Sequence, residues 1–320
     1  MSALKSLAAN RWQFLRLVIT ILSVALVVYL LSQQGWDEIL AAVARIAPWR
    51  LALAFALMIM SRLAVSGRWY SLLRAADPNV TFLQSARVTF AGLFASNFLP
   101  TTVGGDVVRL AGAIQMRQDG VVSAASLVVD RLVGMAGMAM AAPFGLPALQ
   151  GATAFGLIGL TRSGGAHSLA ALSPVVWLRS SWAWLIHAWQ RLAAALLLWR
   201  HTPLALVVSL LFTWTHMACL FGVIAVLLGG MGIQASFWRI GGLYSLVYFV
   251  TLLPFSINGY GFQEISMTFF FSNLTGASVG NALTLALLFR TFMMAASLPG
   301  ALFVPAVLSG AGRGSEEVEG

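Results

Sequence analysis

The chain contains six apolar runs whose lengths approach that of a membrane-spanning helix. They lie at about 14–31, 48–66, 121–142, 143–160, 203–229 and 282–308. A helix needs about 20 apolar residues to cross the hydrocarbon core of a bilayer, where no water satisfies an irregular backbone. Charged residues make up only 9% of the chain, against roughly a quarter in soluble domains. The sequence therefore predicts an all-α polytopic membrane protein with about six full spans.

The domain organisation that follows from these runs is simple. We expect one integral membrane domain, 1–310, and a disordered polar tail, 311–320. The stretch 177–200 is rich in Trp and Arg, which favour the interface between membrane and water. We interpret it as an interfacial amphipathic helix.

Basic residues set the expected orientation in the membrane. The net charge is +9, from 19 Lys and Arg against 10 Asp and Glu. Because arginines in short loops follow the positive-inside rule, they do not require a nucleic-acid partner. Lys5, Arg11 and Arg16 precede the first run, which lacks a small-residue cleavage site. We therefore expect a retained first span in the inner (plasma) membrane, both termini in the cytoplasm, and no nucleic-acid binding.

Residues suited to metal or covalent chemistry are few. The chain has one cysteine, Cys219, and four histidines without metal-ligand or triad spacing. No phosphate-binding glycine motif follows a strand pattern. We expect no disulfide, metal, cofactor or enzymatic activity.

Two stretches interrupt the apolar pattern with Pro, Gly and an acidic residue. They are 96–109 (SNFLPTTVGGDVVR) and 254–264 (PFSINGYGFQE). Unsatisfied backbone or buried charge in lipid costs several kcal/mol, so such breaks need a structural or functional reason. We predict a broken or re-entrant helix pair around each break.

The two breaks also suggest an inverted repeat, with units of about 81–142 and 240–308. Asp106 precedes Arg131 by 25 residues, and Glu264 precedes Arg290 by 26. In the expected topology the two breaks enter the membrane from opposite sides. Transporters of this kind form a substrate site from half-helices whose positive N-termini face anionic groups.

Charged residues within spans are the first candidates for a binding site, because they are expensive in a membrane. The charged candidates are Asp106, Arg109, Asp130, Arg131, Glu264 and Arg290. Arginine suits a phosphate because its fork binds two oxygens and stays protonated. A structural alternative makes Asp106 a helix N-cap and pairs Arg131 or Arg290 with Asp130 or Glu264. Arg62, near the inner end of its span, is expected to reach water.

Polar and small residues of the breaks complete the candidate site. Their amide and hydroxyl groups can satisfy freed backbone, and glycine allows positive φ or close backbone approach. These candidates are Asn97, Thr101, Gly104, Gly105, Ser256, Asn258 and Gly259.

The motifs resemble the lysylphosphatidylglycerol synthase transmembrane-region family, polytopic proteins that include the lipid-translocating portion of bacterial multiple-peptide-resistance proteins. The resemblance lies in 97–109, 129–134 (VDRLVG), 254–264, and Arg290 with the LPG at 298–300. It implies a lipid flippase or lipid-linked carrier translocator, with the six charged candidates at the family's charged positions. Two features depart from the family. Gln263 stands where Arg is common, and no aminoacyl-transfer domain is present, so we expect no lysine transfer.

These observations lead to one hypothesis and two alternatives. We expect a flippase that moves an anionic phospholipid or a polyprenyl-phosphate-linked lipid between leaflets. The alternatives are a membrane-embedded enzyme acting on a lipid-linked sugar or phosphate, and a scaffold subunit of a lipid-synthesis complex. Membrane lipids are the expected partners, with a homo-oligomer or a lipid-synthesis protein as further possibilities.

Overall fold

The computed structural model describes residues 36–97, 104–116, 118–145, 199, 202–252 and 259–307, and four single positions within 21–29. Every regular element in these ranges is a helix. The main helices are α2 (Trp36–Ala44), α3 (Pro48–Ala76), α4 (Phe82–Ser96), α5 (Gly104–Gln115), α6 (Gly120–Ala141), α9 (Pro203–Gly230), α10 (Phe237–Leu252), α11 (Phe262–Thr275) and α12 (Val279–Ser297). Short 3-10 turns, η1 (Ala142–Phe144) and η3 (Leu298–Leu302), extend α6 and α12.

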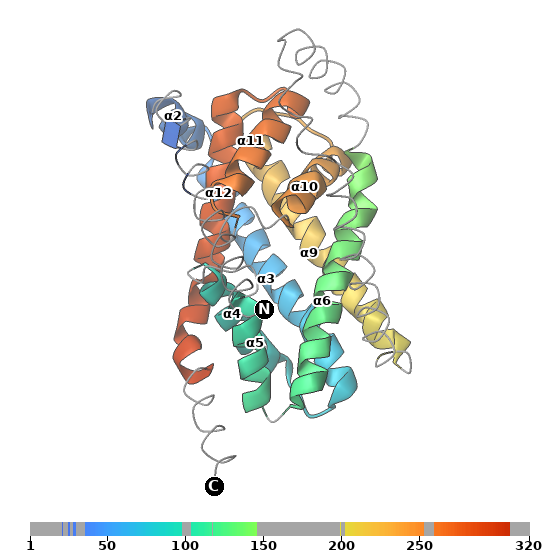
Figure 1. Ribbon diagram of the computed structural model, residues 1–320. Helices are drawn as coiled ribbons and strands as arrows, with labels where there is room; N and C mark the ends of the chain where they lie inside the picture. The colour runs from blue at the N-terminus through green and yellow to red at the C-terminus, as the bar shows by residue number, and fades with distance from the viewer. Residues whose placement is uncertain are drawn as a thin grey trace, which may run out of the picture.

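Among the described residues, four helices are long and apolar enough to cross a bilayer, namely α3, α6 with η1, α9, and α12 with η3. They run along most of the height of the molecule, with α3 and α9 crossing its centre (Figure 1). Four of the six predicted spans are thus present as apolar helices. The other two, 14–31 and 143–160, lie almost entirely outside the described residues, as do the expected interfacial helix and the tail.

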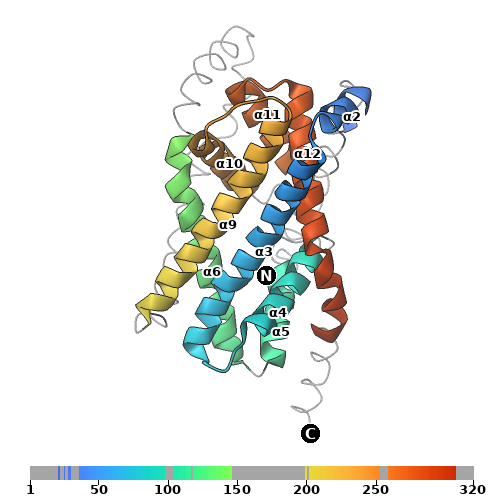
Figure 2. The ribbon, with the colours of Figure 1, turned by 180° about the vertical axis from the view of Figure 1, so that it is seen from behind.

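The helices of the two broken regions are short and lie at opposite ends of the molecule. Helices α4 and α5 lie together near one end, whereas α10 and α11 lie near the other (Figures 1 and 2). The order of one long helix, two short helices and one long helix occurs twice, as α3 to α6 and as α9 to α12. The repeat units were expected to begin at about residues 81 and 240. In the structure, each of these units is preceded by a further long helix, α3 in the first case and α9 in the second.

Local sequence explains where several of these helices begin. Thr81 caps α4 through a reciprocal pair of hydrogen bonds with Gln84, and Asp119 accepts from the backbone N–H groups of Val121 and Val122 at the start of α6. Proline occupies the first turn of both α3 and α9, where its missing N–H costs nothing. These caps satisfy donors that a helix end would otherwise leave exposed to an apolar medium.

Close contact between α4 and α5 depends on glycine. A Cβ atom on Gly105 would overlap Oγ of Ser96 and would lie 2.6 Å from the carbonyl oxygen of Gly92. Gly105 therefore allows the two short helices to touch through their backbones. Gly300 in the LPG motif has a similar role, because a Cβ there would overlap the carbonyl oxygen of Phe90 in α4.

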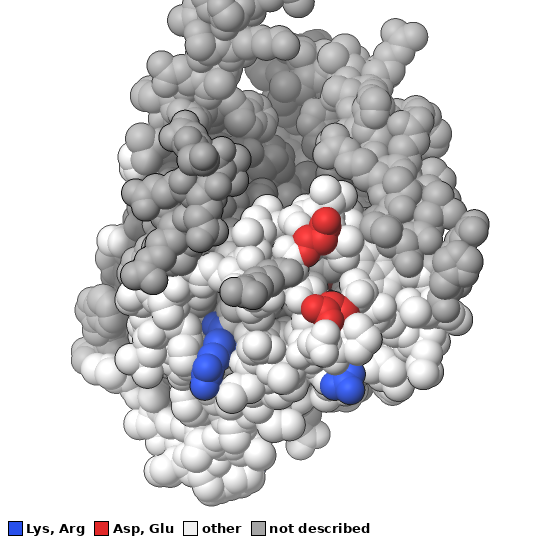
Figure 3. Space-filling view, turned by 90° about the horizontal axis from the view of Figure 1, so that it is seen from below, with Lys and Arg blue, Asp and Glu red and all other residues white. Residues whose placement is uncertain are grey.

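The charged residues of the described chain are not gathered on the end where α3 finishes and α6 begins. Seen from this end, the described surface is largely uncharged, with separate basic and acidic side chains (Figure 3). Several charged side chains are instead buried, among them Arg62, Arg68, Arg109, Asp130 and Glu264.

Candidate functional site

A cavity of about 220 Å³ lies among the long helices and the first short pair. Its wall includes residues of α3, α4, α5, α6, α9 and α10. The charged lining residues are Arg68, Asp106, Arg109, Asp130 and Arg131. Four of the predicted charged candidates, two from α5 and two from α6, are therefore brought together with Arg68 of α3.

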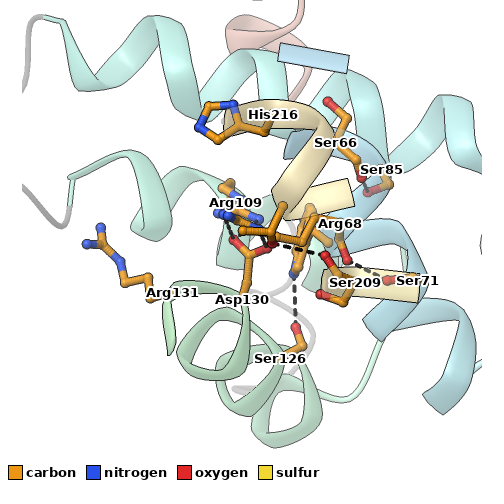
Figure 4. Close-up of polar contacts among 12 residues, drawn as sticks. Ser66, Arg68, Ser71, Ser85, Arg109, Ser126, Asp130, Arg131, Ser209 and His216 are labelled. Atoms are coloured by element: carbon orange, nitrogen blue, oxygen red, sulfur yellow. Dashed lines mark hydrogen bonds and ion pairs between the residues drawn. The ribbon is translucent and has the colours of Figure 1, made fainter. Parts of the chain in front are cut away.

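Asp130 is the centre of the buried charges. Its side chain is fully buried, and it accepts from Nε of Arg68 at 2.7 Å and from Nη2 of Arg68 at 3.1 Å. Its Oδ2 also accepts from Nη2 of Arg109 at 3.0 Å (Figure 4). One carboxylate thus holds two guanidinium groups, one from α3 and one from α5.

Asp106 connects this set to a more exposed arginine. It pairs with Arg109 at 3.3 Å and with Arg131, whose side chain points away from Asp130 (Figure 4). The side chain of Arg131 is 45% exposed, against 8% for Arg109. Three arginines and two aspartates therefore form one connected cluster, which we call the α5–α6 charge cluster, with a net charge of +1.

Packing around the cluster fixes two of its arginines. The guanidinium of Arg109 lies 4.4 Å from the centre of the Trp69 ring, a cation–π contact. A Cβ on Gly134 would lie 2.7 Å from Nη1 of Arg68. Because Asp130 and Gly134 are one helical turn apart, the VDRLVG stretch supplies both the partner of Arg68 and the space for it.

A second cluster forms around Arg290. Its Nε donates to Oε1 of Glu264, its Nη2 donates to the carbonyl oxygen of Gly259 at 3.1 Å, and its guanidinium lies 4.9 Å from the Tyr260 ring centre. The φ of Gly259 is 71°, a left-handed conformation that glycine adopts without strain. The pairing of Arg290 with Glu264, which the structural alternative allowed, is present.

The two broken regions touch each other. The hydroxyl of Tyr260 donates to the carbonyl oxygen of Asn97 at 2.7 Å, and Nδ2 of Asn97 donates to Oγ of Ser297 at 2.7 Å. The Asn97 side chain was expected to satisfy backbone groups freed by the break, but it donates to a side-chain hydroxyl from the second half of the chain. A smaller cavity of about 130 Å³ adjoins this contact, and its lining includes Arg62, Gln263 and Arg290.

Two features of the structural alternative differ from the structure. Arg131 pairs with Asp106 and not with Asp130, because neighbouring residues on a helix point about 100° apart. Asp106 is the third residue of α5, whose helix already begins at Gly104, so it is not the N-cap. Gly104 and Gly105 are both buried at this helix start. Thr101, Ser256 and Asn258 lie outside the described residues.

Two arginines of α3 differ from what the sequence predicts. The apolar run at 48–66 leaves Arg68 outside the predicted span, but α3 continues to Ala76 and buries Arg68 against Asp130. Arg62 is expected to reach water, but it is only 7% exposed. A signal for the burial of Arg68 was present, because Ser61 and Arg68 are seven residues apart and so share a face of the helix.

Helix α9 carries a polar stripe that was not predicted from the sequence and that faces Ser61 of α3 through His216. Ser209, Thr213 and His216 are spaced by four and three residues, and His216 lines the larger cavity. The imidazole Nδ1 of His216 lies 2.7 Å from Oγ of Ser61. Within the described ranges, no group of three or more His, Cys, Asp or Glu could hold a metal ion.

Comparison with known proteins agrees with the motifs. The family described as the lysylphosphatidylglycerol synthase TM region matches residues 13–300. A protein of Methanothermobacter thermautotrophicus, named UPF0104 membrane protein, is 30% identical over 94 residues. This match covers 29% of the chain and 27% of the relative, so it extends over only about a quarter of that protein.

Proposed function

The chain belongs to the lysylphosphatidylglycerol synthase transmembrane-region family, and we propose that this integral membrane protein moves an anionic lipid between leaflets. The lipid is an anionic phospholipid or a polyprenyl-phosphate-linked lipid. The observation that carries the proposal is the α5–α6 charge cluster, in which three arginines share two carboxylates beside a cavity. Its excess positive charge suits one negatively charged headgroup.

The energetic argument concerns the net charge of this cluster. A charged side chain inside a membrane is costly and is retained mainly for function. Asp106 and Asp130 offset two of the three guanidinium groups, so the five side chains together carry a charge of +1. A lipid phosphate binds a guanidinium through two oxygens. Its arrival would neutralise the cluster, while the hydrocarbon tails stay in the bilayer.

The arrangement of short helices supports transport over binding alone. We propose that α4 with α5 and α10 with α11 are re-entrant pairs of an inverted repeat that starts at α3 and α9. Repeats of this kind place a site at the midplane and open it alternately to each side. The N-terminus of α5, beside Asp106, would add the positive end of its dipole to the headgroup site.

We propose no covalent chemistry for this site. Asp106 and Asp130 are each occupied by ion pairs with arginines, which leaves neither carboxylate free to hold a reacting group. We place the protein in the inner (plasma) membrane with both termini in the cytoplasm, following the distribution of its loop arginines.

Lipid that co-purifies with the protein tests the substrate class. Mass spectrometry would compare the wild type, Arg109→Gln, and a control, Arg45→Gln, whose side chain is exposed. We expect an anionic phospholipid or polyprenyl phosphate to be enriched over the total membrane extract with the wild type and the control, and lost with Arg109→Gln. Equal lipid profiles for all three proteins would contradict the proposal.

A further inference from the structure

The smaller cavity lies between the last turn of α4 and the first turn of α11. Its lining comes from α3, α4, α11 and α12, and includes Arg62, Leu93, Ser96, Gln263, Arg290 and Met293. Leu93 and Ser96 also line the larger cavity. The last turns of α4 therefore form a wall that the two cavities share.

Arg62 is the unexplained residue of this cavity. It is 7% exposed, and its Nε is buried without a hydrogen-bond partner. No described carboxylate forms an ion pair with it. A buried charge without a partner is strongly unfavourable, so its presence in a wall of the cavity indicates a ligand that supplies the missing negative charge.

Other donors face the same ligand. Arg290 uses Nε and Nη2 for Glu264 and Gly259, and no described residue accepts from its Nη1. The amide of Gln263 has only a weak contact with the sulfur of Met293 at 3.9 Å. Gln263 is the second residue of α11, so the N-terminal end of that helix, where the helix dipole is positive, lies beside the cavity as well.

The charges near the cavity do not balance. Arg62 and Arg290 carry two positive charges, and Glu264 supplies one negative charge, which leaves +1. The cavity volume is about 130 Å³, roughly the volume that four water molecules occupy in the liquid. That space accommodates a tetrahedral oxyanion.

We propose that Arg62, Arg290 and Gln263 form a second oxyanion site, which takes the phosphate group of a lipid or free inorganic phosphate. For the transport step, this second site rests on the proposed function. The phosphate would pass between the α5–α6 charge cluster and the second site, which are separated by Leu93 and Ser96. The binding itself is a separate property of the cavity, and it is measured separately.

Binding experiments on the full chain in nanodiscs of neutral lipid test the site. The variants are Arg62→Gln and a control, Arg239→Gln, whose side chain is exposed. The probes are inorganic phosphate, dihexanoyl phosphatidic acid, and dihexanoylglycerol, which lacks phosphate. We expect Arg62→Gln to weaken binding of the phosphate-bearing probes at least tenfold, with Arg239→Gln unchanged. Equal affinity in wild type and Arg62→Gln overturns the proposal.

The two phosphate probes identify the source of the oxyanion. If inorganic phosphate binds as tightly as dihexanoyl phosphatidic acid, and both depend on Arg62, the site accepts free phosphate. If only the lipid binds, and still depends on Arg62, its phosphate is the ligand. Binding of dihexanoylglycerol with the same affinity as phosphatidic acid would show that phosphate is not recognised and would overturn the site.

A stability measurement separates a ligand site from a structural role. If Arg62 serves a ligand, Arg62→Gln removes an unpaired buried charge, so the ligand-free variant should melt at the same temperature as the wild type or higher. Arg62→Lys should keep the charge and part of the affinity, since lysine lacks the fork. A lower melting temperature together with unchanged phosphate binding would assign Arg62 a structural role instead.

The outcomes also distinguish this site from the proposed function. If the wild type moves lipid but Arg62→Gln binds phosphate normally, the second site is wrong and transport stands. If the wild type moves no lipid but binds phosphate through Arg62, the site stands and the transport proposal fails.

Discussion

Arg68 and Asp130 form a two-contact ion pair across 62 residues of sequence, with Nε to Oδ1 at 2.7 Å and Nη2 to Oδ2 at 3.1 Å. The pair joins α3 to α6 and is shared with Arg109 from α5. It therefore connects the first short-helix pair to two of the long helices. The stability predictions for Asp130 and Gly134 rest on this ion pair.

Asp130→Asn should destabilise the protein strongly. The change leaves Arg68 and Arg109 buried without their shared carboxylate, and breaking a buried pair on one side costs about 3–5 kcal/mol. The apparent melting temperature in detergent measures the loss. A double-mutant cycle with Arg68→Gln is the control, because the double variant should recover part of the stability. Additive losses would show that the two residues do not interact.

Gly134→Ala should weaken the same pair by steric pressure. Its Cβ would lie 2.7 Å from Nη1 of Arg68, and overpacking of this kind costs about 1–3 kcal/mol. Gly120→Ala is the matched control in α6, because its Cβ would meet nothing closer than 3.8 Å. Thermal melts should show a loss for Gly134→Ala alone. An equal change in both variants would contradict the packing seen at Arg68.

Tyr260→Phe tests the contact between the two broken regions. The change removes the hydroxyl that donates to Asn97 and retains the ring over Arg290. We expect a loss of about 1 kcal/mol, typical of one hydrogen bond, whereas Tyr260→Leu should lose more because the cation–π contact also disappears. Identical melting temperatures for the two variants would show that the ring contributes nothing.

The loop residue Asp77 gives a prediction on pH. A hydrogen bond from the Gln118 side chain, and then one from the Asn79 backbone, lower the pKa of Asp77 from its ordinary value of 3.8. Because the folded pKa is depressed, this stabilisation is present above pH 3.8 and is lost as pH falls through the lower folded value. Asp77→Asn should therefore melt below the wild type at neutral pH, and the difference should shrink under acid. A difference independent of pH would exclude this cause.

The sequence predicted the main features of the fold because lipid imposes strict rules on composition. The breaks at 96–109 and 254–264 stood out, since Pro, Gly and charge are rare in apolar helices. The Glu264–Arg290 pair also followed from this reasoning. Boundaries were harder, because the apolar run of α3 ends at Ser66 while the helix continues to Ala76.

Long-range contacts account for what was missed. Arg68 has the sequence context of a flanking loop residue, and its partner Asp130 belongs to another helix. Asn97 donates to Ser297, 200 residues away, and no local pattern specifies such a pairing. Arg62 resembles a side chain that reaches water, and only the packing of α4, α11 and α12 around it reveals its burial.

Leaflet exchange in reconstituted vesicles tests the central proposal most directly. Fluorescent phosphatidylglycerol is placed in both leaflets, and dithionite added outside bleaches only the dye that reaches the outer leaflet. Wild-type protein and Arg45→Gln should let dithionite bleach dye from both leaflets, whereas Arg109→Gln should protect the inner-leaflet dye. Persistent protection of the inner-leaflet dye with wild-type protein, as in protein-free vesicles, would contradict the account.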